Sequence, residues 1–300
     1  MIAWKAHAKP IYSIAFTPDS SAVVTASGDE TVKLWDWANK AELRSWPGSK
    51  FWSPLAVSAD GRFVARGGYG VAVWPTDATE PALEAEGFTE AVDFSPDSSV
   101  FVAHGNSGVA LRRWKVPGFK TARGGWGGTR TESSFPTGAM RFSHDGGTLA
   151  TTFGVLNEKR DRFDSVIVLR DASSGKETAR LTPAKPPPAH ASELAFTRDG
   201  SHLAAIYGPV LIVWDVASGT EACRQQPSKK HFKGLSCAPD GRLLTACNDH
   251  SLQVWSHPGW QEAAAFDWKI GRLLCVAVSA DGTMAAAGSA TGRVIVWDLE

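Results

Sequence analysis

Two charged residues occupy a position that carries a small side chain in the other copies of a repeated pattern. Each copy is a short apolar run that ends in a turn containing Asp, and the position lies four residues before that Asp. Small residues at five of seven equivalent positions indicate a tightly packed site, where an unpaired charge is costly. Asp93 and Arg141 come from consecutive copies, which predicts an ion pair; the functional alternative is an acid and a charge stabiliser lining a channel. The seven residues are Ala15, Ala56, Asp93, Arg141, Ala195, Ser236 and Ala277.

A second set of residues combines aromatic and charged side chains where each apolar run begins, seven to ten residues before the turn Asp. Aromatic rings beside cations suit an extended peptide with acidic or phosphorylated residues. The alternative is that these are packing residues of loops, with charges that are merely solvated. The predicted partner-binding residues are Tyr12, Lys50, Trp52, Phe88, Glu90, His190, Lys230, His231, Lys233 and Arg272.

The sequence carries no pattern typical of a catalytic or cofactor site. No nucleophile elbow, phosphate-binding loop, zinc helix or calcium loop occurs. The four cysteines form no CxxC pair and have no histidine at zinc spacing, which indicates thiols packed in the core. The histidines are scattered over different turns and strands. We therefore predict no catalytic residue, no metal and no cofactor.

Composition and charge exclude further classes of partner. Lys plus Arg number 31 and Asp plus Glu number 31, so the surface lacks the excess of basic charge that attracts nucleic acid. Residues 1–12 lack the apolar segment of a signal peptide. No stretch approaches the ~18 uncharged apolar residues of a membrane span. These features predict a cytoplasmic protein that contacts neither nucleic acid nor membrane.

Short strands must position these residues. Residues 14–36 contain three apolar, strand-like runs separated by a Pro-Asp turn and a Gly-Asp turn, and the last run ends in Trp-Asp. The first turn recurs seven times, which identifies a repeat. Its Asp residues are Asp19, Asp60, Asp97, Asp145, Asp199, Asp240 and Asp281. The closing aromatic residues are Trp35, Trp74, Trp114, Trp214, Trp255 and Trp297, with Arg170 at the fourth position.

The chain resembles the WD-repeat (WD40) β-propeller family through these turns and through its three Trp-Asp pairs, at about 40 to 45 residues per repeat. The resemblance implies an all-β fold, a seven-bladed propeller of four-stranded antiparallel blades, with residues 1–300 as a single domain. It also implies a buried tetrad that is complete in the first repeat alone, as His7, Thr25 or Ser27, Asp29 and Trp35. The sixth repeat retains Asp249 and Trp255. Trp214 and Trp297 have the corresponding structural role.

Two irregularities in the repeat lead to specific expectations. The chain ends on the third strand of a repeat, so residues 1–5 are predicted to pair with residues 294–297 and to complete the last blade. Arg170 replaces the repeated Trp, and we expect its aliphatic stem to pack while its guanidinium faces a carboxylate or solvent.

Three insertions are expected on one face of the propeller, near blades three to five. They are residues 123–138, predicted as a weak outer strand with a long loop, residues 157–164, predicted as a charged loop, and residues 182–190, predicted as a stiff Pro-rich connector. Loops on a rigid scaffold often carry binding sites.

These observations predict a non-catalytic scaffold that binds a protein or peptide through the loop-rich rim of its central channel. Two alternatives remain open. One is an enzyme of the hydrolase or lyase type, or a small-molecule binder, with a site at the channel mouth. The other is a purely structural part of a larger complex, because a fold does not by itself determine a function.

Overall fold

The computed structural model describes residues 1–50, 53–105, 111–121, 134–159, 161–227 and 230–299. All the regular elements in these ranges are β-strands, and they form antiparallel sheets. The predicted all-β fold is therefore confirmed. The described ranges contain no helix that is long and apolar enough to cross a membrane.

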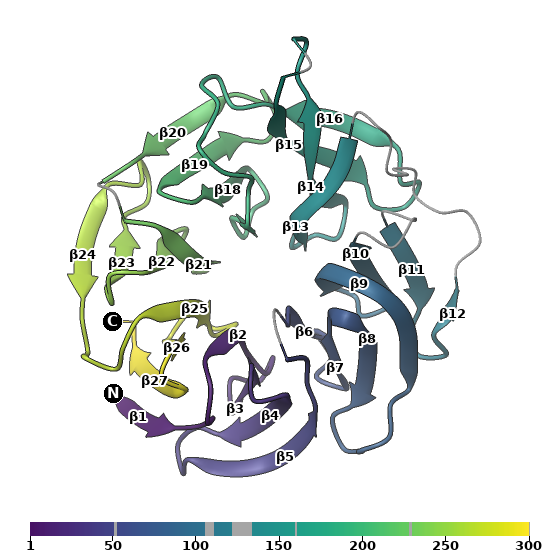
Figure 1. Cartoon of the computed structure of the whole chain (residues 1–300), viewed down its shortest axis with the longest axis vertical. Helices are drawn as coiled ribbons and strands as arrows, with labels where there is room; N and C mark the ends of the chain where they lie inside the picture. Colours follow the sequence, from purple (N-terminus) through teal and green to yellow (C-terminus); the bar gives the residue numbers. More distant parts are fainter. Residues whose placement is uncertain (51–52, 106–110, 122–133, 160, 228–229, 300) are drawn as a thin grey trace.

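Five of the sheets have four strands each, arranged radially about a common axis (Figure 1). In spatial order they are β2 (Ile11–Phe16), β3 (Ala22–Ser27), β4 (Thr31–Asp36) and β5 (Ala41–Pro47); β13 (Ser134–Phe142), β14 (Thr148–Leu156), β15 (Phe163–Asp171) and β16 (Glu177–Leu181); β17 (Glu193–Phe196), β18 (His202–Tyr207), β19 (Val210–Asp215) and β20 (Glu221–Gln225); β21 (Phe232–Cys237), β22 (Leu243–Cys247), β23 (Leu252–Trp255) and β24 (Glu262–Phe266); and β25 (Leu273–Val278), β26 (Met284–Ser289), β27 (Arg293–Asp298) and β1 (Ile2–Lys5).

The sixth sheet has seven strands because β9 takes part in two repeats. Its order is β6 (Leu55–Val57), β7 (Phe63–Arg66), β8 (Gly68–Pro75), β9 (Leu83–Phe94), β10 (Val100–Gly105), β11 (Leu111–Lys115) and β12 (Lys120–Thr121). The first half of β9 pairs with β8 and the second half with β10. Gly87, at φ 105°, bends this continuous strand where it passes from one repeat to the next.

The first strand of the chain pairs with the last, as predicted. Ile2 is paired with Val296, and Trp4 with Val294, in an antiparallel ladder. Trp4 is 7% exposed and packs edge-on against Trp35 with ring centroids 5.9 Å apart. The N-terminal strand thus joins the last sheet and also contacts the first one.

The apolar core lies between neighbouring sheets. In one cluster, Val24 and Leu34 from β3 and β4 pack against Val64 and Trp74 from β7 and β8. Both faces of each sheet must be covered in this arrangement, which explains why central strands such as β3 are buried at every residue. The innermost strands contact one another in the order β2, β6, β9, β13, β17, β21 and β25, and β25 contacts β2.

The Asp turns share one hydrogen-bonding pattern. The hydroxyl of Ser143 donates to Oδ1 of Asp145 at 2.6 Å, and the backbone N–H of Gly147 donates to the same oxygen at 2.9 Å. The hydroxyl bond lowers the pKa of the Asp145 carboxyl group. The same Ser or Thr contact is found at Asp19, Asp60, Asp97, Asp199 and Asp281. A Ser or Thr two residues before the Asp therefore supports six of the seven turns, whereas Ala238 stands at this position before Asp240, which accepts from the backbone N–H of Arg242 at 3.0 Å.

Arg170 occupies the position that Trp has in the other sheets. It is paired with Leu149, as Trp214 is paired with Leu203, and it is 9% exposed. Its guanidinium Nη1 donates to the backbone carbonyl of Gly175 at 3.4 Å. The predicted packing is found, but the hydrogen-bond partner is a main-chain carbonyl, whereas we had expected a carboxylate or solvent.

Two insertions differ from the expectation. Residues 134–138 are part of strand β13, and the outer strand β12 precedes residue 123, so the predicted division of residues 123–138 was wrong. Residues 122–133 lie outside the described ranges. Strands β14 and β15 extend into the second insertion, with Leu156 paired to Phe163, so the predicted loop over residues 157–164 was too long at its C-terminal end. Backbone pairing continues wherever two strands can extend together, and this shortens the loop.

Candidate functional site

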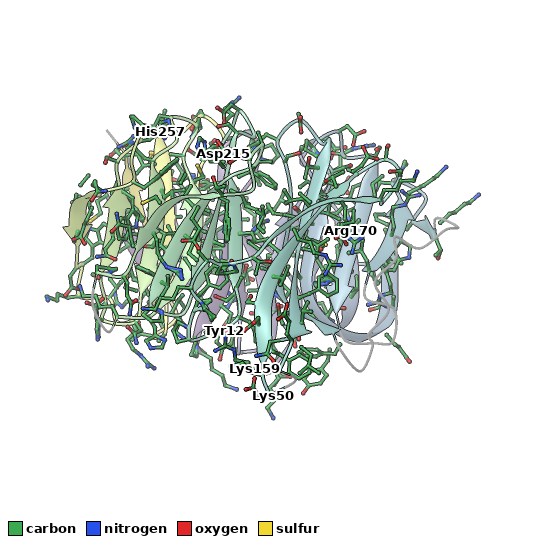
Figure 2. The ribbon with its side chains drawn as sticks, turned by 90° about the horizontal axis from the view of Figure 1, so that it is seen from above. Tyr12, Lys50, Lys159, Arg170, Asp215 and His257 are labelled. Carbon is green, nitrogen blue, oxygen red and sulfur yellow. The ribbon has the colours of Figure 1, made fainter. Side chains whose placement is uncertain are left out.

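Two of the predicted binding residues, Tyr12 and Lys50, share one face with the second insertion. Figure 2 shows Tyr12, Lys50 and Lys159 at one end of the molecule and Asp215 and His257 at the opposite end. We call the end that bears Tyr12, Lys50 and Lys159 the rim face. Connections that enter an innermost strand emerge there, whereas the turns after the Trp position emerge on the other side.

A cavity of about 390 Å³ lies along the axis and is lined by all seven innermost strands. The residue four before each turn Asp lines it in every repeat. Alanine or serine at five of these positions leaves room for the Asp93 and Arg141 side chains. The sequence pattern therefore located the wall of the central channel.

The predicted Asp93–Arg141 ion pair is present, with 3.7 Å between Oδ1 and Nη1. Asp93 Oδ2 also accepts a hydrogen bond from the backbone N–H of Phe142 at 2.9 Å. Burial raises the pKa of the Asp93 carboxyl group, although Arg141 and this hydrogen bond oppose the shift. The Ser236 hydroxyl makes the equivalent contact in another sheet, accepting from the N–H of Val278 at 3.2 Å. Asp93 thus links two neighbouring sheets as well as carrying charge.

Glu193 is a channel residue that the sequence analysis missed. It lines both the central cavity and the mouth beside Tyr12 and Glu90. Burial raises its pKa to about 7, and the nearby Arg141 charge partly offsets the effect. Glu193 lies two residues before Ala195 in β17, so strand alternation places both side chains on the same face. Extending the alignment by two residues would have found it.

We expect Glu193 to make stability depend on pH. Because its folded-state pKa lies above the ordinary value of 4.5, its contribution to the free energy of unfolding is greatest below that value and is lost as pH rises to about 7. Glu193→Gln should therefore be more stable than the wild type at pH 8, by about 2–3 kcal/mol, with little gain at pH 4.

Urea unfolding at both pH values measures this difference. Asp93, Arg141, His144 and Tyr12 line the same cavity and remain unchanged in both proteins, so their titration contributes to both curves. Identical pH slopes for the two proteins would show that Glu193 is ionised freely in the folded state.

The structure places the other predicted binding residues as follows. Tyr12 and Glu90 are half-buried at the channel mouth, and His190 is half-buried beside residues 162–165 and the Pro-rich connector. Lys230 forms an ion pair with Asp249, 2.7 Å between Nζ and Oδ2, so its charge is offset within the protein. Trp52 lies outside the described residues. The exposed members are Lys50, Phe88, His231, Lys233 and Arg272.

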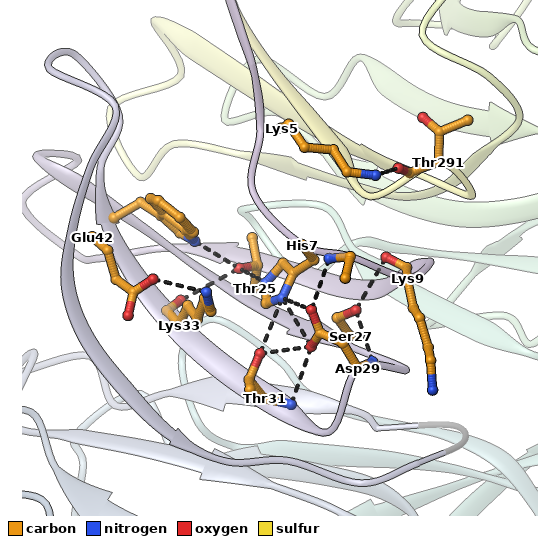
Figure 3. Close-up of polar contacts among 12 residues, drawn as sticks. Lys5, His7, Lys9, Thr25, Ser27, Asp29, Thr31, Lys33, Glu42 and Thr291 are labelled. Atoms are coloured by element: carbon orange, nitrogen blue, oxygen red, sulfur yellow. Dashed lines mark hydrogen bonds and ion pairs between the residues drawn. The ribbon is translucent and has the colours of Figure 1, made fainter.

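The buried tetrad of the first repeat is complete, and Thr25 is the hydroxyl that it uses (Figure 3). The Thr25 oxygen lies 2.7 Å from Nε2 of His7 and accepts from Nε1 of Trp35 at 3.0 Å. Nδ1 of His7 lies 3.0 Å from Asp29. Ser27 instead donates to the backbone carbonyl of Lys9 at 3.1 Å. Burial lowers the pKa of His7, which favours the neutral imidazole that this chain of hydrogen bonds requires.

Comparison with known proteins agrees with this geometry. Residues 2–36, 225–256 and 269–298 match the family described as WD domain, G-beta repeat. These three segments of the chain thus match WD40 repeats. The first match contains the complete tetrad, and the second contains Asp249 and Trp255, with the Trp255 indole donating to Thr245 at 3.0 Å. The third match contains β27, the strand with which β1 pairs. The predicted resemblance to WD-repeat proteins is therefore confirmed.

Two relatives match different shares of the chain. The nuclear distribution protein PAC1 of Arthroderma otae is 26% identical over 286 residues, 84% of this chain and 60% of the relative. The transcription initiation factor TFIID subunit 5 of Caenorhabditis elegans is 25% identical over 126 residues, 38% of this chain and 18% of the relative. The chain thus spans less than two thirds of either protein.

Proposed function

We propose that this WD40 protein is a non-catalytic scaffold that binds a protein or peptide partner through its rim face. The observation that carries the proposal is the gathering of Tyr12, Lys50 and the insertion residue Lys159 at one end of the channel (Figure 2). Aromatic side chains beside cations dominate many protein interfaces. One of the two relatives is a subunit of a transcription initiation factor, which supports a role in a larger assembly.

The architecture proposed for this function is one seven-bladed propeller that spans residues 1–300. In this proposal β9 provides the outer strand of the second blade and the inner strand of the third, and β1 closes the ring by completing the seventh. Contacts that run around the innermost strands and return from β25 to β2 support it. A closed ring leaves only the short outer edges of the blades unpaired and holds the rim residues at fixed distances.

The proposed partner segment is acidic or phosphorylated. Lys9, Lys233 and Arg272 lie at the starts of three neighbouring inner strands, and each is exposed. Within the described part of the chain, none of the three forms an ion pair. Their charges are therefore available to carboxylate or phosphate groups. We further propose a cytoplasmic location without nucleic-acid or membrane contacts, supported by four cysteines that are all free.

A specific observation favours a second candidate, a small-molecule site at the channel mouth. Glu193 has a pKa of about 7 and shares the cavity with Arg141, Asp93 and His144. An acid that titrates near neutral pH beside a cation can exchange a proton with a bound ligand. A hydrolase or lyase reaction would need substrate positioned against this carboxyl group, which makes Glu193→Gln the variant that separates the two functions.

The scaffold proposal predicts that Tyr12→Ala with Lys233→Glu weakens partner capture by about tenfold or more, because it removes an aromatic contact and reverses a charge on the rim face. The melting temperature should change little, since Lys233 is exposed and Tyr12 lies at the channel mouth. The measurement is quantitative affinity capture from native lysate, followed by titration with the captured protein.

His257→Ala with Lys40→Glu is the matched control. Both residues are exposed, and the pair likewise removes a ring and reverses a charge. His257 lies at the opposite end of the molecule in Figure 2, and Lys40 lies between β4 and β5, in a turn that follows the Trp position. Wild-type capture by the rim variant, together with loss of capture by the control, would mean that the partner binds the other face.

A further inference from the structure

Two exposed aromatic residues lie in contact where β8 and β9 begin to separate. Tyr69 is 67% exposed and Phe88 is 37% exposed, and the two residues are paired across the strands. Their rings meet edge-on with centroids 5.6 Å apart. Burial of aromatic side chains is a major source of stability, so an exposed pair indicates a surface suited to a partner.

The surface beside these rings is acidic. Glu84, Glu86 and Phe88 alternate along β9, and all three are exposed. Together with Tyr69 they line a hollow of about 580 Å³. Across the described ranges, neither glutamate side chain makes a hydrogen bond or an ion pair. Glu84 nevertheless interacts electrostatically with the positive charge of Arg66.

The two nearest arginines are engaged with the main chain. Nη1 of Arg66 donates to the carbonyls of Tyr69 and Gly70, at 3.3 and 3.4 Å. Nη1 of Arg112 donates to the carbonyl of Glu86 at 2.7 Å. Arg66 lines the hollow on the side of Glu84, with its Nη1 occupied by these two carbonyls, and the Glu84 and Glu86 side chains remain exposed. The hollow is therefore held in place by the seven-stranded sheet, with its aromatic and acidic groups already arranged.

We propose that this hollow binds a lysine or arginine side chain from an extended segment of a partner protein. The aliphatic stem would lie across Tyr69 and Phe88, and the cationic end would reach Glu84 and Glu86. Cations bind favourably over aromatic faces, and two adjacent carboxylates provide charge-assisted hydrogen bonds. This site lies on β8 and β9, whereas the basic rim residues Lys9, Lys233 and Arg272 lie beside β2, β21 and β25. This inference goes beyond the proposed function, because the hollow would select basic residues of a partner, whereas the rim cations would select acidic ones.

Synthetic nine-residue peptides test the proposal by fluorescence anisotropy with the full chain. One peptide alternates lysine with glycine, one alternates glutamate with glycine, and one alternates leucine with serine. The lysine peptide should bind, should weaken as salt rises from 50 to 300 mM, and should lose at least tenfold in affinity with Glu84→Lys/Glu86→Lys. Tyr69→Ser should weaken it about two- to fivefold.

Asp77→Lys/Glu80→Lys is the matched control, since both residues are exposed acids in the turn that joins β8 to β9, and the change in net charge is the same. It should alter binding by less than about twofold at 300 mM salt, where general attraction is screened. Equal losses for the two double variants, absence of lysine-peptide binding, or tighter binding of the glutamate or leucine peptide would each overturn the proposal. Tyr12→Ala/Lys233→Glu should leave the lysine peptide bound, so failure of the rim proposal would be recognised separately.

Discussion

Deletion of residues 1–6 is expected to lower the free energy of unfolding by about 5 kcal/mol or more. The deletion removes the whole β1 ladder to β27 and the buried side chain of Trp4. Loss of a buried Trp costs about 3–5 kcal/mol, and each net hydrogen bond contributes about 1 kcal/mol. It would also leave the apolar residues Val294 and Val296 beside an open sheet edge.

Thermal unfolding measures this effect, and a fall of about 10–20 °C in melting temperature is expected for a domain of this size. Trp4→Ala alone should account for about 3–5 kcal/mol of the loss, because it leaves the backbone ladder in place. Removal of Met1 alone is the control, since Met1 is 73% exposed and precedes β1. A truncated chain that melts with the wild type would show that β1 does not stabilise the last sheet.

The second large effect is expected at the Asp93–Arg141 pair. Asp93→Ala should cost about 3 kcal/mol, because it removes the acceptor for Phe142 and leaves Arg141 without its carboxylate. Arg141→Ala should cost less, about 1–2 kcal/mol, because its side chain is 38% exposed and water already screens it. The double Ala variant should lose less than the sum of the two, because its small side chains reproduce those at Ala15 and Ala195.

A double-mutant cycle in urea measures the coupling. We expect an interaction energy of about 1 kcal/mol, which exceeds the ~0.3–0.5 kcal/mol scatter of independent sites. Ser236→Ala provides the control, because it removes the equivalent bond from Val278 without a change of charge, at about 1 kcal/mol. Additive losses at Asp93 and Arg141 would mean that the two charges act independently, and the ion pair would then have no energetic meaning.

The rim and the hollow at Tyr69 and Phe88 together form a surface that carries both positive and negative charges. Exposed cations lie at the starts of β2, β21 and β25, whereas exposed carboxylates lie on β9. A partner that contacts both would need acidic and basic segments in a fixed order along its chain. Such complementarity sets orientation and excludes wrong partners more than it raises affinity.

The sequence by itself determined the repeat, the all-β class, the pairing of β1 with β27, the wall of the channel, and the positions of Arg170 and the Asp93–Arg141 pair. These features follow from local chemistry at regular intervals. Six of the seven Asp turns carry a hydroxyl two residues earlier, and a strand alternates its side chains with a period of two. A missing fourth strand is visible in the sequence because each repeat needs one.

Other features were decided by tertiary structure alone. Thr25 and Ser27 lie on the same face of β3, so spacing could not choose between them, and their distances to His7 and Trp35 did. The charge of Lys230 is offset by Asp249, which comes from a different turn. Fusion of two repeats through β9 exposes Tyr69 and Phe88 side by side. Each outcome depends on which groups from separate strands meet in space, and the intervals along the chain do not fix those distances.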